Sequence, residues 1–139
     1  MGAYTKIKTR KEAREIMMQT IFQMDAQKSF NIKDEFLQGK TVEKEHAYCR
    51  NLLENISTNI AKIDQLIDES SNGWSIPRLA KTDLAILRLA ITELLYFDDI
   101  SGAITINEAV ELAKKYGTDS SPKFINAVLG TAYAKINEK

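Results

Sequence analysis

An aromatic side chain and a cation stand side by side near the end of the chain, at Lys123 and Phe124. Ser121 and Pro122 precede them, and a serine followed by a proline is typical of the beginning of an α-helix. The first turn of a helix presents free backbone N–H groups and a partial positive charge, which attract anions. A ring for stacking, a cation and free N–H donors together suit a nucleotide.

A second group of cations lies at the beginning of the chain. Residues 1–14 hold one acid and five bases, whereas the whole chain balances 19 Lys and Arg against 19 Asp and Glu. Charge that is segregated to one end indicates an interaction surface, although a solvated tail that only aids solubility is the alternative. Single-stranded RNA binding requires cations that track phosphates and an exposed ring that stacks on a base. The five bases are Lys6, Lys8, Arg10, Lys11 and Arg14.

The other polar residues do not have the spacing of a catalytic or metal site. His46 and Cys49 could share one face of a helix, but two ligands do not make a structural zinc site. A Cys–His nucleophilic pair would also lack a third orienting group and oxyanion donors. The sequence contains no glycine-rich phosphate loop and no dinucleotide fingerprint. We therefore predict a binding protein that is not an enzyme and has no metal or cofactor.

The elements that position these residues are predicted to be helices. Only two prolines and six glycines are present, and apolar residues recur with helical period, which favours an all-α fold. The first helix is expected over residues 10–27, opened by a capping box of Thr9 and Glu12. Met18 and Phe22 lie away from its apolar stripe and form a second apolar patch. Such a patch either packs beneath a neighbouring loop or receives a partner.

The middle of the chain predicts a short helix at residues 34–37 and two consecutive helices over residues 42–68. The break between these two falls at residues 57–59, where Ser, Thr and Asn side chains compete for backbone hydrogen bonds. The longest helix is expected over residues 75–97, and it is apolar around most of its circumference, as a buried hub is. Asp83 and Glu93 fall in its apolar sector, so each is paired inside the fold or held for a partner.

The last two helices are predicted from their end signals. Thr105 and Glu108 have the spacing of a capping box, and Gly117 offers a left-handed end to the same helix. Ser121 and Pro122 then open the final helix. Cys49 is the single cysteine, and the sequence has neither the apolar run of a signal peptide nor a membrane-spanning stretch, so we expect a cytoplasmic location.

The runs INEAVELAKKYG and SPKFINAVLG closely resemble the C-terminal signature of the NusB family of bacterial transcription antitermination factors. The resemblance includes Leu87-Arg88 and Glu93-Leu94 in the middle of the chain. It extends to the first helix, where the matching residues are Arg10, Lys11, Arg14, Glu15, Gln19 and Phe22.

This resemblance implies a NusB-like fold of about seven helices, forming one domain of residues 1–139. This domain would consist of two packed three-helix bundles, formed by residues 1–74 and residues 75–139. The implied RNA is a boxA-type single strand, and the implied effect is read-through by an RNA polymerase antitermination complex in ribosomal RNA operons. The implied protein partner is NusE, a small-subunit ribosomal protein, which would meet Met18, Phe22 and Asp83. The implied RNA-binding residues share one face and are Lys8, Arg10, Lys11, Arg14, Lys123 and Phe124.

The sequence departs from the family pattern in two places, and two other functions stay open. Phe22 stands where tyrosine is frequent, and the N-terminal motif mixes lysine with arginine, which loses bidentate phosphate contacts. One alternative is a protein-binding or homodimeric helical adaptor that uses Met18, Phe22 and Asp83 and has no RNA function. The other is an accessory domain of an RNA cytosine methyltransferase, which we do not favour because no cofactor domain follows.

Overall fold

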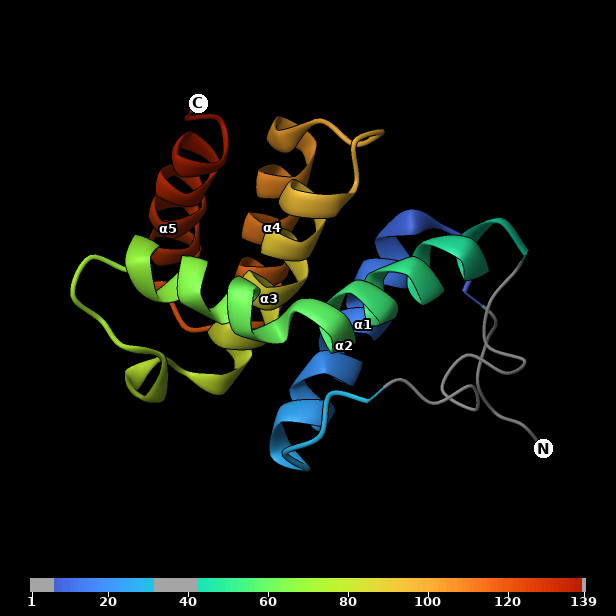
Figure 1. The fold of residues 1–139 in the computed structure, drawn as a ribbon, viewed down its shortest axis with the longest axis horizontal. Helices are drawn as coiled ribbons and strands as arrows, with labels where there is room; N and C mark the ends of the chain where they lie inside the picture. Colours follow the sequence, from blue (N-terminus) through green and yellow to red (C-terminus); the bar gives the residue numbers. More distant parts are fainter. Residues whose placement is uncertain (1–6, 32–42, 139) are drawn as a thin grey trace.

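The computed structural model describes residues 7–31 and 43–138, and these residues form helices joined by turns, without a β-strand (Figure 1). This confirms the all-α class. The short helix expected at residues 34–37 lies outside the described residues. In order, the helices are α1 (Arg10–Ala26), α2 (Glu43–Ser70), the 3-10 helix η2 (Ile76–Arg78), α3 (Lys81–Tyr96), α4 (Gly102–Tyr116) and α5 (Ser121–Ile136).

Helix α3 is the centre of the fold, as its apolar circumference predicts. It packs against α1, α2, α4 and α5, and every residue from Asp83 to Glu93 is buried. Figure 1 shows α5 and the beginning of α1 on opposite sides of α3 and α4. The expected boundary between bundles of residues 1–74 and 75–139 stays a prediction. None of the helices in the described ranges combines the length and the hydropathy that a bilayer crossing requires.

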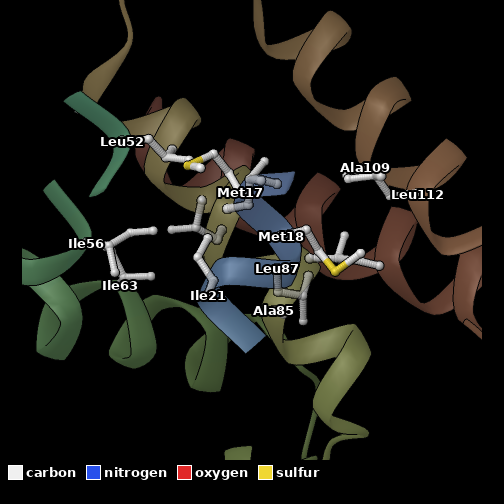
Figure 2. Packing of buried hydrophobic residues seen from close by; sticks show 14 of the residues in the cluster. Met17, Met18, Ile21, Leu52, Ile56, Ile63, Ala85, Leu87, Ala109 and Leu112 are labelled. Carbon is white, nitrogen blue, oxygen red and sulfur yellow. The ribbon is translucent and has the colours of Figure 1, made fainter. Parts of the chain in front are cut away.

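The hydrophobic core joins α1 and α2 to α3. Figure 2 shows Met17 and Ile21 of α1 lying between the α2 side chains and Leu87 of α3. Ile56 and Ile63 of α2 are fully buried on the two sides of a kink at Asn59, whose φ of −119° and ψ of 21° are not helical. The kink lies at the predicted break in residues 57–59, and α2 continues through it.

The prediction of one long helix over residues 75–97 is wrong. Pro77 opens only the 3-10 turn η2, and then Leu79 and Ala80 take extended conformations with ψ of 144° and 139°. The extended backbone directs Leu79 into the core, where it is buried. Packing of this side chain therefore outweighs continuation of the helix, and α3 begins only at Lys81.

The helix ends confirm one predicted cap and correct two. Thr9 and Glu12 form the expected capping box of α1. Helix α4 begins at Gly102, earlier than predicted, because the Ser101 hydroxyl accepts a hydrogen bond from the Ile104 N–H. Gly117 has a φ of −93°, which is not left-handed. A glycine is required here because the Cβ atom of any other residue would lie 2.5 Å from the Ser121 Oγ atom.

A buried carboxylate fastens four helices together. Glu93 of α3 accepts two hydrogen bonds from the Arg14 guanidinium of α1, at 2.8 and 3.0 Å. It also accepts hydrogen bonds from the Tyr48 hydroxyl of α2 and, at 2.7 Å, from the Thr105 hydroxyl of α4. Thr105 therefore serves this network and does not form the capping box predicted with Glu108. Glu93, which the sequence places in the apolar sector of α3, is therefore paired inside the fold.

A second ion-pair network fastens the other end of α1. Arg88 of α3 donates to Asp64 of α2 at 2.8 and 2.9 Å and to Asp25 of α1 at 3.0 Å. Burial alone would raise the pKa of Asp25, but the hydrogen bond and charge of Arg88, with Lys81, hold it below its usual value. Helix α1 is thus fixed to α3 near both of its ends.

We expect Glu93→Gln to lower the free energy of unfolding by about 3–5 kcal/mol, because it leaves the buried Arg14 guanidinium without a counter-charge. Urea denaturation followed by circular dichroism measures this. Glu111→Gln is the matched control, since Glu111 is exposed on α4, and it should cost no more than about 0.5 kcal/mol. An unchanged urea midpoint in Glu93→Gln would show that the network does not hold the helices together.

Candidate nucleic-acid interface

The N-terminal cations lie on and just before the first two turns of α1. Lys8 is exposed and forms no ion pair with any described residue, and Lys11 is also exposed. Arg10 is half-buried: its guanidinium lies 4.2 Å from the centre of the Tyr48 ring and donates to Glu45 at 2.7 Å. The structure therefore exposes the side chains of Lys8 and Lys11 and holds Arg10 against α2.

Arg14 has a structural role in this fold, and its predicted contact with RNA stays a prediction. It is buried, and its charge is already neutralised by Glu93 in the network described above. Burial alone would lower the pKa of the Arg14 guanidinium, but the hydrogen bonds and charge of Glu93 raise it above its usual value. Arg14 is thus a permanently charged structural residue that positions α1.

A groove of about 250 Å³ separates α1 from α4. Ion pairs cross it from Lys11 to Glu108, at 3.7 Å, and from Lys115 to Glu15, at 2.7 Å. Burial alone would raise the pKa of Glu15, but the Lys115 hydrogen bond and neighbouring charges hold it below its usual value. The lining residues are Lys11, Arg14, Glu15, Glu108, Glu111, Leu112, Lys114 and Lys115.

Lys114 and Lys115 are candidates that the sequence interpretation missed. Both are exposed in the last turn of α4, where cations interact favourably with the helix dipole, so their place in the sequence does not by itself indicate a ligand. Only the tertiary structure brings them to the groove beside Lys11. In both pairs that cross the groove, the lysine is exposed and the carboxylate is half-buried. Ion pairs at a protein surface contribute about 0–1 kcal/mol, so these pairs add little to the stability of the fold.

Lys123 and Phe124 lie in the first turn of α5, as predicted, but not in the groove beside α1. Lys123 is exposed and forms no ion pair with any described residue, and Phe124 is half-buried against the core. Phe124 lines a separate groove of about 400 Å³, formed by α5 and the end of α2. The ring and the N-terminal cations therefore line two different grooves, and the expectation that they share one RNA-binding face stays a prediction.

The three predicted partner-binding residues have different environments. Phe22 is 41% exposed and lines a groove of about 500 Å³ with Phe30 and Lys81. Met18 is only 3% exposed, so the expected patch of Met18 and Phe22 does not form, and Met18 cannot contact a partner directly. Asp83 lies in the first turn of α3, and its buried Oδ1 atom accepts no hydrogen bond from the described residues.

The described residues contain no cluster of three or more His, Cys, Asp and Glu side chains that could hold a metal. Cys49 is buried in the core, and burial, with the nearby Glu45 charge, raises the pKa of its thiol to about 12. A thiol with this pKa is neutral at pH 7 and is a poor nucleophile. Cys49 is therefore a thiol of the hydrophobic core.

Comparison with known proteins shows which family this chain resembles. The family model described as the NusB family matches residues 11–134. The transcription antitermination protein NusB of Alkaliphilus oremlandii is 42% identical over 125 residues, covering 88% of this chain and 91% of its own. The protein of the same name from Natranaerobius thermophilus is 40% identical over 136 residues, covering 94% and 98%.

Solved structures show the same fold. The structure of NusB from T. maritima has a TM-score of 0.82 at 32% identity and covers 94% of each chain. A crystal structure of antitermination factors NusB and NusE in complex with dsRNA has a TM-score of 0.78 at 24% identity, covering 91% of this chain and 96% of its own. With a family match over residues 11–134 and curated relatives at about 40% identity, the chain belongs to the NusB family.

Proposed function

We propose that this protein is a transcription antitermination factor that binds boxA-type single-stranded RNA together with NusE. In this function it promotes read-through by RNA polymerase, chiefly in ribosomal RNA operons, and it acts in the cytoplasm by binding, without catalysis. The observation that carries the proposal is the match of residues 11–134 to a family whose curated members are named transcription antitermination proteins.

The cations that the structure leaves available support an RNA surface along α1 and α4. Lys8 and Lys11 come from the beginning of the chain, and Lys114 and Lys115 come from the last turn of α4. Phosphates would replace the carboxylates that now face these side chains. Because Phe124 lies in a different groove, we infer that the RNA strand reaches it beyond the cation groove and stacks a base there.

The groove beside Phe22 supports a separate site for NusE. An exposed aromatic residue next to a second ring, Phe30, is typical of an anchor in a protein interface. Met18 of the same helix is buried in the core and does not line this groove. Asp83 has a buried oxygen without a donor, which is costly unless a partner supplies one.

A homodimeric adaptor remains the second candidate, since the exposed Phe22 groove would also fit another copy of the chain. Sedimentation velocity separates the two functions. The antitermination factor should form a heavier complex with boxA RNA and NusE, whereas the adaptor should dimerise alone and ignore the RNA.

We expect Lys11→Gln to weaken boxA binding and to reduce the salt dependence of the binding constant by about 0.7–1 in log–log slope, because one phosphate contact is lost. Fluorescence anisotropy of a labelled boxA strand at several salt concentrations measures this. Lys62→Gln, which removes an exposed cation from α2, should leave the slope unchanged. Equal slopes for both variants would remove Lys11 from the RNA surface.

We expect Glu108→Gln to tighten boxA binding by about 2–5-fold, because it removes the carboxylate that competes with phosphate for Lys11. The same anisotropy titration measures the gain. Glu54→Gln is the control, since it removes a carboxylate that pairs with Arg50 on the surface of α2, away from the groove. If Glu108→Gln binds no more tightly than this control, the groove between α1 and α4 is not on the RNA path.

We expect Phe22→Ala to weaken NusE binding by about 10-fold or more, because it removes an exposed aromatic anchor, and to leave RNA binding without NusE unchanged. Isothermal titration with NusE measures the first effect, and anisotropy measures the second. Ile104→Ala removes another exposed apolar residue, on α4, and should bind NusE normally. Equal loss in both variants would contradict a specific site at Phe22.

A further inference from the structure

Trp74 is the single tryptophan of the chain, and it belongs to neither the proposed cation surface for RNA nor the proposed NusE site. It is 53% exposed, although tryptophan is usually largely buried. A tight turn presents it: Asn72 and Gly73 have φ of 52° and 94°, and the Trp74 N–H donates to the Ser71 carbonyl at 3.1 Å. Asn and Gly tolerate these left-handed conformations, so the turn determines the position of the Trp74 backbone.

Trp74 and Phe124 line the same groove from two different elements. Trp74 comes from the turn after α2 and Phe124 from the first turn of α5, and α2 packs against α5. No ring contact joins these two side chains, so the groove of about 400 Å³ between them stays open. Ala127 and Val128 of α5 add apolar surface to it. Two aromatic walls with an apolar lining can receive a flat, aromatic ligand.

The charges around this groove favour an anionic ligand. The Arg78 guanidinium lies 5.6 Å from the centre of the Trp74 ring and forms no ion pair with any described residue. Lys123 is exposed next to Phe124, and Glu69 is the single acid in the described lining. Ser70 also lines the groove, and its buried Oγ atom has no hydrogen-bond partner among the described residues.

We propose that this groove, lined by Trp74 and Phe124, is a base-binding subsite for single-stranded RNA. One nucleobase stacks on Trp74, next to Phe124, while Arg78 and Lys123 contact the flanking phosphates. This inference rests on the proposed RNA-binding function and adds Trp74 and Arg78 to its surface. An aromatic pair flanked by unpaired cations fits an RNA strand better than an apolar helix of a protein, which would leave both cations without partners.

The single tryptophan allows a direct test, because stacking of a base on the indole ring quenches its emission. Wild-type protein is titrated with a labelled boxA strand, with and without NusE, while RNA anisotropy and tryptophan emission are followed together. Saturable quenching with the same midpoint as the anisotropy change is expected. Trp74→Phe has no tryptophan, so subtracting its signal removes any emission from NusE.

Variants give a second readout. Trp74→Ala should weaken RNA binding by about 5- to 150-fold, the range measured for loss of one stacked base, whereas Trp74→Phe should keep most of the affinity. Tyr133→Ala is the matched control, since Tyr133 is exposed at the other end of α5, and it should bind normally. Circular dichroism of each variant checks that the helices are intact.

The outcomes separate this inference from the proposed function. RNA binding by anisotropy with unchanged Trp74 emission and unaltered affinity in Trp74→Ala would overturn the subsite and leave the proposed function standing. A change in emission on adding NusE alone, and none on adding RNA, would make this face a protein interface and would also overturn the subsite. Absence of boxA binding in every arm would overturn the proposed function and the inference together.

Discussion

The buried carboxylate of Glu93 is the interaction on which the rest of this structure depends. A charged group in the middle of α3 is costly to desolvate, and the fold offsets this cost with the Arg14 guanidinium and two hydroxyl donors. These donors belong to α1, α2 and α4, so one carboxylate determines how three helices meet the central one. Removal of a single member would leave a buried polar group without its partner.

This network also decides which N-terminal cations are available to a ligand. Arg14 is buried in an ion pair with Glu93. Arg10 is half-buried and contacts Glu45 and the Tyr48 ring. The charge that remains for RNA comes from lysines whose surface ion pairs are weak. Rigid placement of α1 by its arginines thus leaves the neighbouring lysines exposed at fixed positions. In the proposed function, structural and binding roles are thus divided between the arginines and the lysines.

The aromatic residues of the proposed RNA and NusE sites occupy separate surfaces. Phe22 lies beside α1 and the residues that follow it, whereas Phe124 and Trp74 lie between α5 and the end of α2. Separate grooves allow RNA and a protein partner to be bound at the same time without competition for one ring. The backbone that carries each ring is held by a packed helix or a tight turn.

The sequence by itself determined the all-α class, the capping box of α1, the central position of α3 and the kink near residues 57–59, because these depend on local periodicity and local hydrogen bonds. It could not decide that Thr105 and Arg14 serve Glu93, that Met18 is buried, or that Leu79 enters the core from an extended segment. It also could not place Phe124 beside Trp74 and away from Lys11. Those outcomes depend on contacts between residues far apart in the chain, where burial and ion pairing outweigh local helix signals.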